Sequence, residues 1–415
     1  MASDASATGN GWFRDRTYRP PQPPIVSVAA SDPNHSRHCG HDPQSQQGLS
    51  QAILVRAVVV TWNGAALLPA CLDSLVNQTI PAGSLEILVV DNGSTDGTLK
   101  LLAEQYPDIR VLALPENLGF AGGVAAGTAD LLTEGGLWVV EAEQRSGSGL
   151  ETTRPQYVAL LNNDARFEPD AIGQLITAIN QDANTGAATA LVLLDENADT
   201  GNEQVRPRGY PRTSADIPGQ ARNDDRAFRP PRQRGSAIIN STGNILTASG
   251  AATDRDYGLP LSELPDDPDH RQVFGFNGGA ALIRIEALKQ AGGFDSSLFL
   301  YYEDTDLSFR LRRAGWNIVF APAAVAWHRH MASTGGETSP IFRYYNTRNS
   351  LIIAARYLPR RVLIKSIARQ TLGLIRHTLI RDESKSVRQA RRRGLTAALR
   401  LLPHEISSRK LLNSN

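Results

Sequence analysis

Residues 53–98 read ILVRAVVVTWNGAALLPACLDSLVNQTIPAGSLEILVVDNGSTDGT. Two short aliphatic runs rich in β-branched residues, at 53–63 and 85–91, predict strands that are buried on both faces. Between them, residues 64–78 place leucines at helical spacing, which predicts a helix with one apolar side. A strand, a helix and a second strand in this order predict a parallel β-α-β unit.

The alternation of helix and strand continues beyond this stretch. The further predicted elements are a helix at 96–106, a strand at 109–117, a helix at 119–135, a strand at 157–169 and a helix at 169–180. Thr95 or Asp96 is expected to cap the first of these helices, and Pro169 lies near the start of the last. The pattern predicts an α/β fold with a mostly parallel central sheet that is flanked by helices.

The chain divides into three regions by composition. Residues 1–50 are rich in Ser, Pro, Asn, Gln and Asp, carry few large apolar side chains, and are expected to form a disordered tail. Residues 51–335 are expected to form the α/β domain, with insertion loops at about 141–155 and 193–272. We place the second insertion near the acceptor side of a site. Residues 336–415 are expected to be helical and basic.

Composition excludes several classes of protein. A formal net charge of +1 argues against a nucleic-acid-binding domain. Cys39 and Cys71 cannot form a disulfide framework, and a reducing cytoplasm fits them best. His35, His38 and His41 could bind a metal together with Cys39, but a plain polar tail is the favoured interpretation. The sequence has no run of about 18 uncharged apolar residues and no signal peptide, so any membrane contact is expected to be peripheral.

Polar side chains follow three of the predicted strands. They are Thr61 and Asn63, Asp91 and Asn92, and Asn162, Asn163 and Asp164. Ligands of open parallel sheets bind beyond the carboxyl ends of the strands. Asp91 could accept hydrogen bonds from a nucleoside, and Asp164 with Asn162 offers two oxygen ligands for Mg²⁺ or Mn²⁺ bound together with a substrate diphosphate. Each group alone is also ordinary turn chemistry, whereas three groups at one sheet edge favour a binding site.

A glycine-rich turn opens the helix expected at 119–135. It contains Asn117 and Gly122 and resembles a phosphate cradle at a helix N-terminus, although the glycines could equally allow close packing of the helix on a strand. The turn is not G-x-G-x-x-G, and the chain has no G-x-x-x-x-G-K-[ST]. The sequence therefore lacks the fingerprints of dinucleotide dehydrogenases and P-loop NTPases.

The second half of the chain supplies an acidic cluster and a histidine. Glu303, Asp304 and Asp306 follow the aromatic run FLYY at 299–302. Acids in the first turn of a helix are ordinary complements of the helix dipole, but an aromatic surface desolvates a carboxylate and raises its pKa toward the range of a general base. His328 follows a buried strand-like run, which points to a ligand of metal or phosphate.

These pieces, in this order, resemble glycosyltransferase family 2, an inverting family with the GT-A fold. The resemblance covers about residues 54–335 and rests on VVVTWNGAALLPACLDSL, EILVVDNGSTDGT, PENLGFAGGVAAG, LLNNDARFEPDAI, GGFDSSLFLYYEDTDLSFRLRRAGW and VAWHRH. Within the family the chain is most similar to bacterial rhamnosyltransferase-type enzymes of cell-surface polysaccharide synthesis.

The resemblance implies a role for each candidate residue. The donor nucleotide would be bound by Thr61, Asn63, Asp91, Asn92, Asn117, Gly122 and Asn163. A divalent cation, Mg²⁺ or Mn²⁺, would be held by Asp164, Asn162 and His328, with Asn162 standing where many members carry aspartate. The catalytic group would consist of Asp304, Glu303 and Asp306. Asp304 would be the general base, and Glu303 and Asp306 would position the acceptor or the helix.

The resemblance further implies an inverting hexosyltransferase. It would move a deoxyhexose such as rhamnose from a nucleoside-diphosphate donor to a hydroxyl of a glycan or polyprenyl-linked glycan. A non-catalytic nucleotide- or glycan-binding protein is the main alternative, but it would be expected to lack Asp164, Asp304 or His328, and all three are present. A nucleotidyltransferase normally has a basic glycine-rich loop, and TWNGAALLPA has no Lys or Arg.

The last region combines basic and apolar residues in a helical pattern. Its apolar positions include Leu363, Ile364, Ile367, Leu374 and Ile375, and arginines and lysines lie between them. A basic amphipathic helix can lie on an anionic membrane surface, which would place the protein in the cytoplasm at the inner face of the plasma membrane. The alternative is a solvated helix that packs on the catalytic domain.

Overall fold

The computed structural model describes residues 54–133, 155–195, 237–247, 249–329 and 338–412. The tail predicted at 1–50 and nearly all of the insertion predicted at 141–155 lie outside these ranges.

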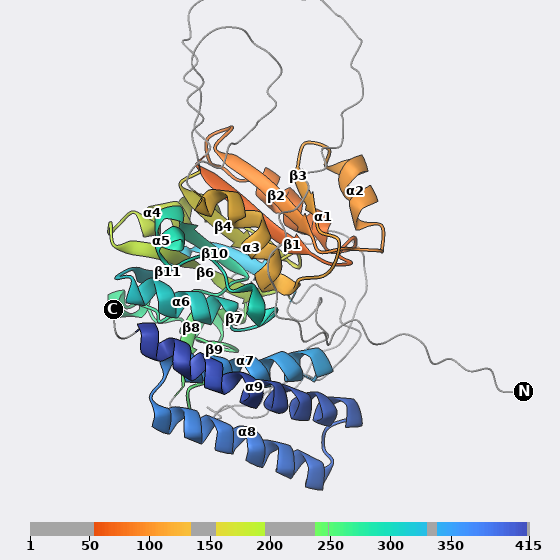
Figure 1. The fold of residues 1–415 in the computed structure, drawn as a ribbon. Coiled ribbons are helices and arrows are strands. Elements are labelled where there is room, and N and C mark those ends of the chain that lie inside the picture. The colour runs from red at the N-terminus through yellow and green to blue at the C-terminus, as the bar shows by residue number, and fades with distance from the viewer. Residues whose placement is uncertain (1–53, 134–154, 196–236, 248, 330–337, 413–415) are drawn as a thin grey trace, which may run out of the picture.

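A nine-stranded sheet forms the centre of the described part of the chain (Figure 1). Its strands lie in the order β3 (Arg110–Ala113), β2 (Leu85–Asp91), β1 (Val55–Thr61), β4 (Tyr157–Leu161), β10 (Ala280–Arg284), β6 (Thr185–Leu194), β11 (Asn317–His328) and β5 (Ala165–Phe167), and β7 (Ile239–Ser241) pairs with β6. A separate hairpin consists of β8 (Asn244–Leu246) and β9 (Ala252–Asp254).

The sheet is mixed rather than mostly parallel. β3, β2, β1 and β4 pair in parallel, as do β6 and β11. β10 runs antiparallel between β4 and β6, and β5 and β7 also pair antiparallel with their neighbours. A short buried run has the same composition in either direction, because strand direction is set by the connections rather than by the residues. The α/β class itself is confirmed.

Helices cover both faces of the sheet, as predicted. One face packs against α1 (Leu68–Val76), α2 (Thr98–Gln105) and α4 (Ala171–Ile179). The other face packs against α3 (Gly119–Leu132), α5 (Ile285–Gln290) and α6 (Glu303–Arg313). Alternation along β1 divides its side chains between the two cores: Val55, Ala57 and Val59 face the first, and Val58 and Val60 the second.

Two local features differ from the sequence prediction. The pattern analysis predicts no strand at 185–194, where the structure has β6, which is nearly all buried. The N-cap of α2 is Gly97, with φ 91°, rather than Thr95 or Asp96. Asp96 instead accepts a hydrogen bond from the Thr98 backbone N–H at 3.1 Å.

The described end of the second insertion consists of loops and short strands. β7, β8 and β9 each have three residues, and two short 3-10 segments follow, η2 (Leu261–Glu263) and η3 (Pro268–Arg271). A third, η4 (Ser296–Leu298), lies between α5 and α6.

The C-terminal region is helical, as predicted. α7 (Pro340–Tyr357), α8 (Arg360–Ile380) and α9 (Lys385–Leu412) pack on one another beside α6 and the β7–β9 segment (Figure 1). None of the helices in the described ranges has the length and apolar character needed to span a membrane.

Candidate active site

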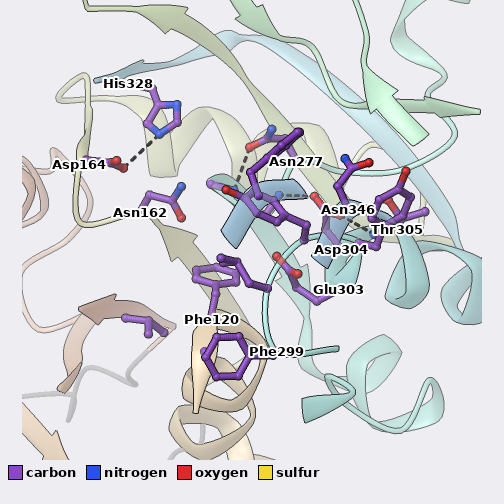
Figure 2. A pocket seen from close by; sticks show the side chains of 18 of the residues that line it. Phe120, Asn162, Asp164, Asn277, Phe299, Glu303, Asp304, Thr305, His328 and Asn346 are labelled. Atoms are coloured by element: carbon purple, nitrogen blue, oxygen red, sulfur yellow. Dashed lines mark hydrogen bonds and ion pairs between the residues drawn. The ribbon is translucent and has the colours of Figure 1, made fainter. Parts of the chain in front are cut away.

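A cavity of 420 Å³ opens at the sheet edge where β1 and β4 end. β10 begins at the same edge, because it runs antiparallel to β4 and pairs Ala280 with Leu161. Residues that follow β1, β4 and β11 line one end of the cavity, and residues that precede or begin α6 line the other (Figure 2). The cavity brings together nine of the predicted residues: Thr61, Asn92, Asn117, Asn162, Asn163, Asp164, Glu303, Asp304 and His328.

Hydrogen bonds between the loops that follow the strands shape the end of the cavity that contains Asp164 and His328. The Asn163 Nδ2 donates to Thr61 Oγ1 at 3.0 Å, which joins the end of β4 to that of β1. The Asn92 Nδ2 donates to the Gly119 carbonyl at 2.9 Å, which joins the end of β2 to the start of α3. Asn117 Oδ1 accepts from the Gly119 N–H at 2.8 Å. These amides therefore hold the loops in place as well as facing the cavity.

Asn63, Asp91 and Gly122 do not line the cavity. The Asn63 Oδ1 accepts from the Thr95 N–H at 2.8 Å. A Cβ at Gly122 would lie 2.6 Å from the Leu118 Cβ, so this glycine permits close packing within its own turn. The binding of the donor by Gly122 stays a prediction.

Asp91 is buried at the end of β2, one residue before Asn92 of the cavity lining. Its Oδ2 accepts from the Ser94 N–H at 3.1 Å, while its Oδ1 is buried and has no hydrogen-bond partner among the described residues. Because a buried acceptor without a donor is unfavourable, this oxygen is suited to accept a hydrogen bond from a ligand.

Asp164 and His328 form a pair at this end of the cavity (Figure 2). Asp164 Oδ1 lies 3.0 Å from His328 Nε2, and His328 Nδ1 lies 2.6 Å from Asn240 Oδ1. Nδ1–H donates to the Asn240 amide oxygen, which leaves Nε2 directed toward the carboxylate. Histidines that bind metal in proteins are commonly oriented by such an outer partner.

These residues fit a divalent cation whose shell is completed by a substrate. Asp164 supplies a carboxylate oxygen, His328 an imidazole nitrogen, and Asn162 an amide group on the same cavity wall. Among the described residues, no three His, Cys, Asp or Glu side chains converge to hold a metal alone. Oxygen-rich sites that share Mg²⁺ or Mn²⁺ with a diphosphate need few protein ligands.

Asp304 lies at the other end of the cavity, in the first turn of α6 (Figure 2). Its Oδ2 accepts from the Gly278 N–H at 3.0 Å, and its Oδ1 accepts from the Thr305 N–H at 2.6 Å. Burial raises the pKa of this carboxyl above that of an ordinary aspartate, and the hydrogen bonds oppose the rise. An aspartate in such surroundings is a stronger base than one in water.

Glu303, the neighbour of Asp304, also has a raised pKa. Burial, with a smaller contribution from the charge of Asp304, raises the pKa of Glu303 to about 8. Its Oε2 is buried and has no hydrogen-bond partner among the residues described. Glu303 is therefore mostly protonated at neutral pH and can donate a hydrogen bond into the cavity.

The turn that leads into β10 connects the two ends of the cavity. The Asn162 N–H donates to the Gly279 carbonyl at 3.0 Å, and the Gly278 N–H donates to Asp304 at 3.0 Å. A Cβ at Gly279 would lie 3.0 Å from Asn162 Nδ2 and 2.9 Å from Asn277 Oδ1. Main-chain groups of two adjacent residues, Gly278 and Gly279, thus link the Asn162–Asp164 segment to the candidate base.

Asp306 does not contact the cavity, which corrects its assignment to the catalytic group. Its side chain is 1% exposed, and its Oδ1 accepts from Arg356 Nη1 at 2.9 Å and from the Tyr357 hydroxyl at 2.7 Å. Its Oδ2 accepts from Arg310 Nε at 2.8 Å. Asp306 therefore joins α6 to α7, in line with the expectation that an acid here positions the helix.

The cavity also includes residues that the sequence did not reveal. They are mainly amides, a carboxylate and aromatic residues: Asn240, Asn244, Asp254, Asn277, Phe120 and Phe342. Asp254 accepts from Asn277 Nδ2 at 2.8 Å, and burial together with the charge of Asp304 raises its pKa. For the residues of the second insertion, the sequence offered one sign of a role in the site, which was the predicted place of this insertion near the acceptor side. Strands of three residues are too short to show a periodicity that would predict them.

Comparison with known proteins gives matches to glycosyltransferases. A family model described as "Glycosyltransferase like family 2" matches residues 52–347. The N-acetylglucosaminyl-diphospho-decaprenol L-rhamnosyltransferase of Mycobacterium tuberculosis (strain CDC 1551 / Oshkosh) is 27% identical over 340 residues, which cover 81% of this chain and 95% of that protein.

A solved structure has a similar fold. The crystal structure of GalNAc-T7 with UDP, GalNAc and Mn²⁺ aligns with a TM-score of 0.50 at 13% identity. The alignment covers 86% of this chain, which spans 57% of that protein. The expected GT-A type of α/β fold is thereby confirmed.

Proposed function

The chain belongs to glycosyltransferase family 2 and is a hexosyltransferase, and from that premise we propose its substrates and the roles of its residues. We propose that it transfers a deoxyhexose, with rhamnose favoured, from a nucleoside diphosphate to a hydroxyl of a polyprenyl-linked glycan in cell-surface polysaccharide synthesis. The similar mycobacterial protein is named for L-rhamnosyl transfer to a decaprenol-linked acceptor, and that name supports the proposed donor and acceptor.

One observation carries the proposal most directly. A single cavity has the Asp164–His328 pair at one end and the half-buried carboxylate of Asp304 at the other. Sugar transfer from a nucleoside diphosphate needs a group that stabilises a leaving diphosphate and a base that takes the acceptor proton.

Each end of the cavity is assigned one substrate. The donor nucleotide is assigned to Thr61, Asn92, Asn117 and Asn163, with the unpartnered Oδ1 of Asp91 available to a ribose or base donor. The acceptor is assigned to the end that contains Asp304. No observation favours the binding-protein alternative, because Asp164, Asp304 and His328 are all in place.

The chemical step follows from the two ends. The Asp304 carboxylate accepts the proton of the acceptor hydroxyl as that oxygen bonds to the anomeric carbon, and the bond from this carbon to the diphosphate oxygen breaks. Attack from the face opposite the leaving group inverts the anomeric configuration. A divalent cation held by Asp164, His328 and Asn162 would neutralise charge on the diphosphate. The neutral carboxyl of Glu303 adds no second negative charge and can donate a hydrogen bond to a sugar oxygen.

A donor screen tests the proposed activity. The protein is incubated with Mn²⁺ and a panel of nucleoside-diphosphate sugars, and thermal protection and release of nucleoside diphosphate are measured. A nucleoside-diphosphate deoxyhexose at 100-fold above its Kd is expected to stabilise the fold by about 2.7 kcal/mol. A stronger effect from a hexose that keeps its 6-hydroxyl would reject the deoxyhexose preference, and no effect from any donor would reject the nucleotide-sugar assignment.

The outer face of α8 supports a second part of the proposal, contact with an anionic membrane. We propose that the protein works in the cytoplasm at the inner face of the plasma membrane, where a polyprenyl-linked acceptor would be presented. Leu363, Ser366 and Gln370 face inward, whereas Ile364, Leu372 and Leu379 are exposed by 66%, 65% and 76%. The exposed three recur at eight- and seven-residue intervals, so they form one stripe along the helix.

The charge of α8 favours a bilayer over another occupant of this stripe. Arg360–Ile380 contains no acidic residue and five basic ones: Arg360, Arg361, Lys365, Arg369 and Arg376. Basic side chains beside an exposed apolar stripe suit the interface of an anionic bilayer. A hairpin tip also ties α8 to the cavity region, because Ser366 Oγ donates to the Ser249 carbonyl at 2.8 Å, in the turn that joins β8 to β9.

Vesicle flotation tests the membrane contact. The double variant Leu372→Asp, Leu379→Asp is expected to bind anionic phosphatidylglycerol vesicles at least about tenfold more weakly than the wild type, because two apolar side chains leave the interface. Wild-type binding is expected to fall as salt rises. The matched control is Val76→Asp, Leu99→Asp, which alters exposed apolar residues of α1 and α2. Equal losses of vesicle binding in both variants would contradict the proposal. So would a wild-type protein that is dimeric in solution and becomes monomeric in the α8 variant, because the stripe would then be a dimer interface.

A further inference from the structure

The four-residue segment Phe299–Tyr302, which ends two positions before the candidate base Asp304, has an unusual backbone. Phe299, Tyr301 and Tyr302 all have positive φ values, of 66°, 66° and 72°. Bulky residues rarely adopt this left-handed region, because Cβ crowds the following carbonyl. Such a backbone persists only where the surrounding structure holds it. Phe299, Tyr301 and Tyr302 also line the cavity, so the shape of this segment determines part of the cavity wall.

Asn349 of α7 holds this segment. Its side chain is fully buried, and its Nδ2 donates to the carbonyls of Leu298, Leu300 and Tyr301 at 2.9, 2.9 and 2.8 Å. The amide has two hydrogens, so the three contacts share them. The Asn349 Oδ1 accepts from Arg348 Nη1 at 2.6 Å, which fixes the amide with its nitrogen toward the carbonyls.

Two further contacts hold Phe299 in the segment. The Phe299 carbonyl accepts from the Ala121 N–H at 3.1 Å, and the Phe299 ring stacks on Tyr345 at 4.9 Å. Neither of these two contacts involves the carbonyls of Leu300 and Tyr301, which lie among the left-handed residues. Removing the Asn349 amide would take the described donor from both.

We infer that Asn349 is a positioning residue for the transfer reaction: it holds the Phe299–Tyr302 backbone in the conformation that directs Asp304 into the cavity. This inference rests on the proposed role of Asp304 as the base. Asn349 does not line the cavity, so it acts through the backbone and not on a substrate. The donor end, at Thr61, Asn163 and Asp164, belongs to other loops and is expected to be unaffected.

Steady-state kinetics of Asn349→Ala test the inference. We expect kcat to fall by about 10- to 100-fold, because a small displacement of a catalytic group has an effect of this size. The KM for the donor is expected to change by less than about twofold, since donor contacts lie elsewhere. Thr347→Ala is the matched control, because Thr347 is equally buried on α7 but faces Gly394 of α9.

Hydrogen exchange gives a readout that does not depend on activity. Backbone amides of residues 299–302 are expected to exchange faster in Asn349→Ala than in Thr347→Ala, with the donor end unchanged. If the alanine variant does not fold, Asn349→Ser keeps one donor and is expected to give intermediate values. Wild-type kcat in Asn349→Ala, or equal kcat losses in both variants, would overturn the inference. If exchange is altered in a protein that turns over no donor, the proposed function would be rejected, but the role of Asn349 in holding the Phe299–Tyr302 backbone would stand.

Discussion

Asp304→Asn is expected to lower kcat by about 10²–10⁴-fold, the range by which general bases contribute. The asparagine side chain has the same shape and can still accept from the Gly278 N–H, so the cavity wall is expected to persist. It cannot take a proton from the acceptor hydroxyl. Donor binding, measured by calorimetry with the nucleoside diphosphate and Mn²⁺, is expected to remain within about threefold because Asp304 lies at the other end of the cavity.

Glu303→Gln is the control for this prediction. Glu303 has a pKa of about 8, so glutamine mimics its protonated form, and we expect a loss of less than about tenfold at pH 7. If the two variants show the reverse order, Glu303 rather than Asp304 is the base. The pH profile gives a second check: Asp304 must be ionised, and burial raises its pKa, so activity should fall on acidification at a higher pH than an ordinary aspartate would give.

Asp164→Ala is expected to weaken metal-dependent donor binding by about 10²-fold, because the remaining ligands, His328 and Asn162, carry no negative charge. Binding is measured by titrating the nucleoside diphosphate with and without Mn²⁺. In the absence of metal, wild type and variant are expected to bind the nucleotide similarly.

Asn240→Ala provides a graded comparison for the same site. It removes the acceptor that orients His328 at 2.6 Å and leaves all three candidate ligands in place. Loss of an outer partner of a metal-binding histidine typically costs about 10–100-fold in metal affinity. A Mn²⁺ titration that is identical in wild type and Asp164→Ala would contradict the metal assignment.

Much of the fold follows from local patterns in the sequence. β1, β2 and β4 are buried aliphatic runs, and α1 and α4 have apolar residues at helical spacing, so these elements are recognisable without the structure. The antiparallel insertion of β10 is not, because its direction depends on the path of the chain around β4 and β6. β6 borders the long insertion, and its alanine-rich start lacks the β-branched composition of the other strands.

The candidate site divides in the same way. Asp164, Asp304 and His328 belong to continuous motifs, and the structure brings them to one cavity. Asn240 and Asn349 could not be found, because their roles depend on partners 88 and about 50 positions away, and neither stands in a pattern that periodicity can detect. Asp306 looked like its neighbours in sequence. Only the packing of α7 separates it from them, by placing Arg356 and Tyr357 against its carboxylate.

The turn at Asn277–Gly279 has a consequence for how this enzyme can diverge. The main-chain groups of Gly278 and Gly279 are hydrogen-bonded to Asp304 and Asn162, and they set the span between the candidate base and the candidate metal-binding segment. Most side-chain substitutions are therefore expected to leave this span unchanged. The cavity walls on either side of this turn come from separate loops. Changes in those loops could therefore accommodate new donors and new acceptors. The distance between the donor end and the acceptor end of the cavity would stay the same, because the turn at the start of β10 sets it.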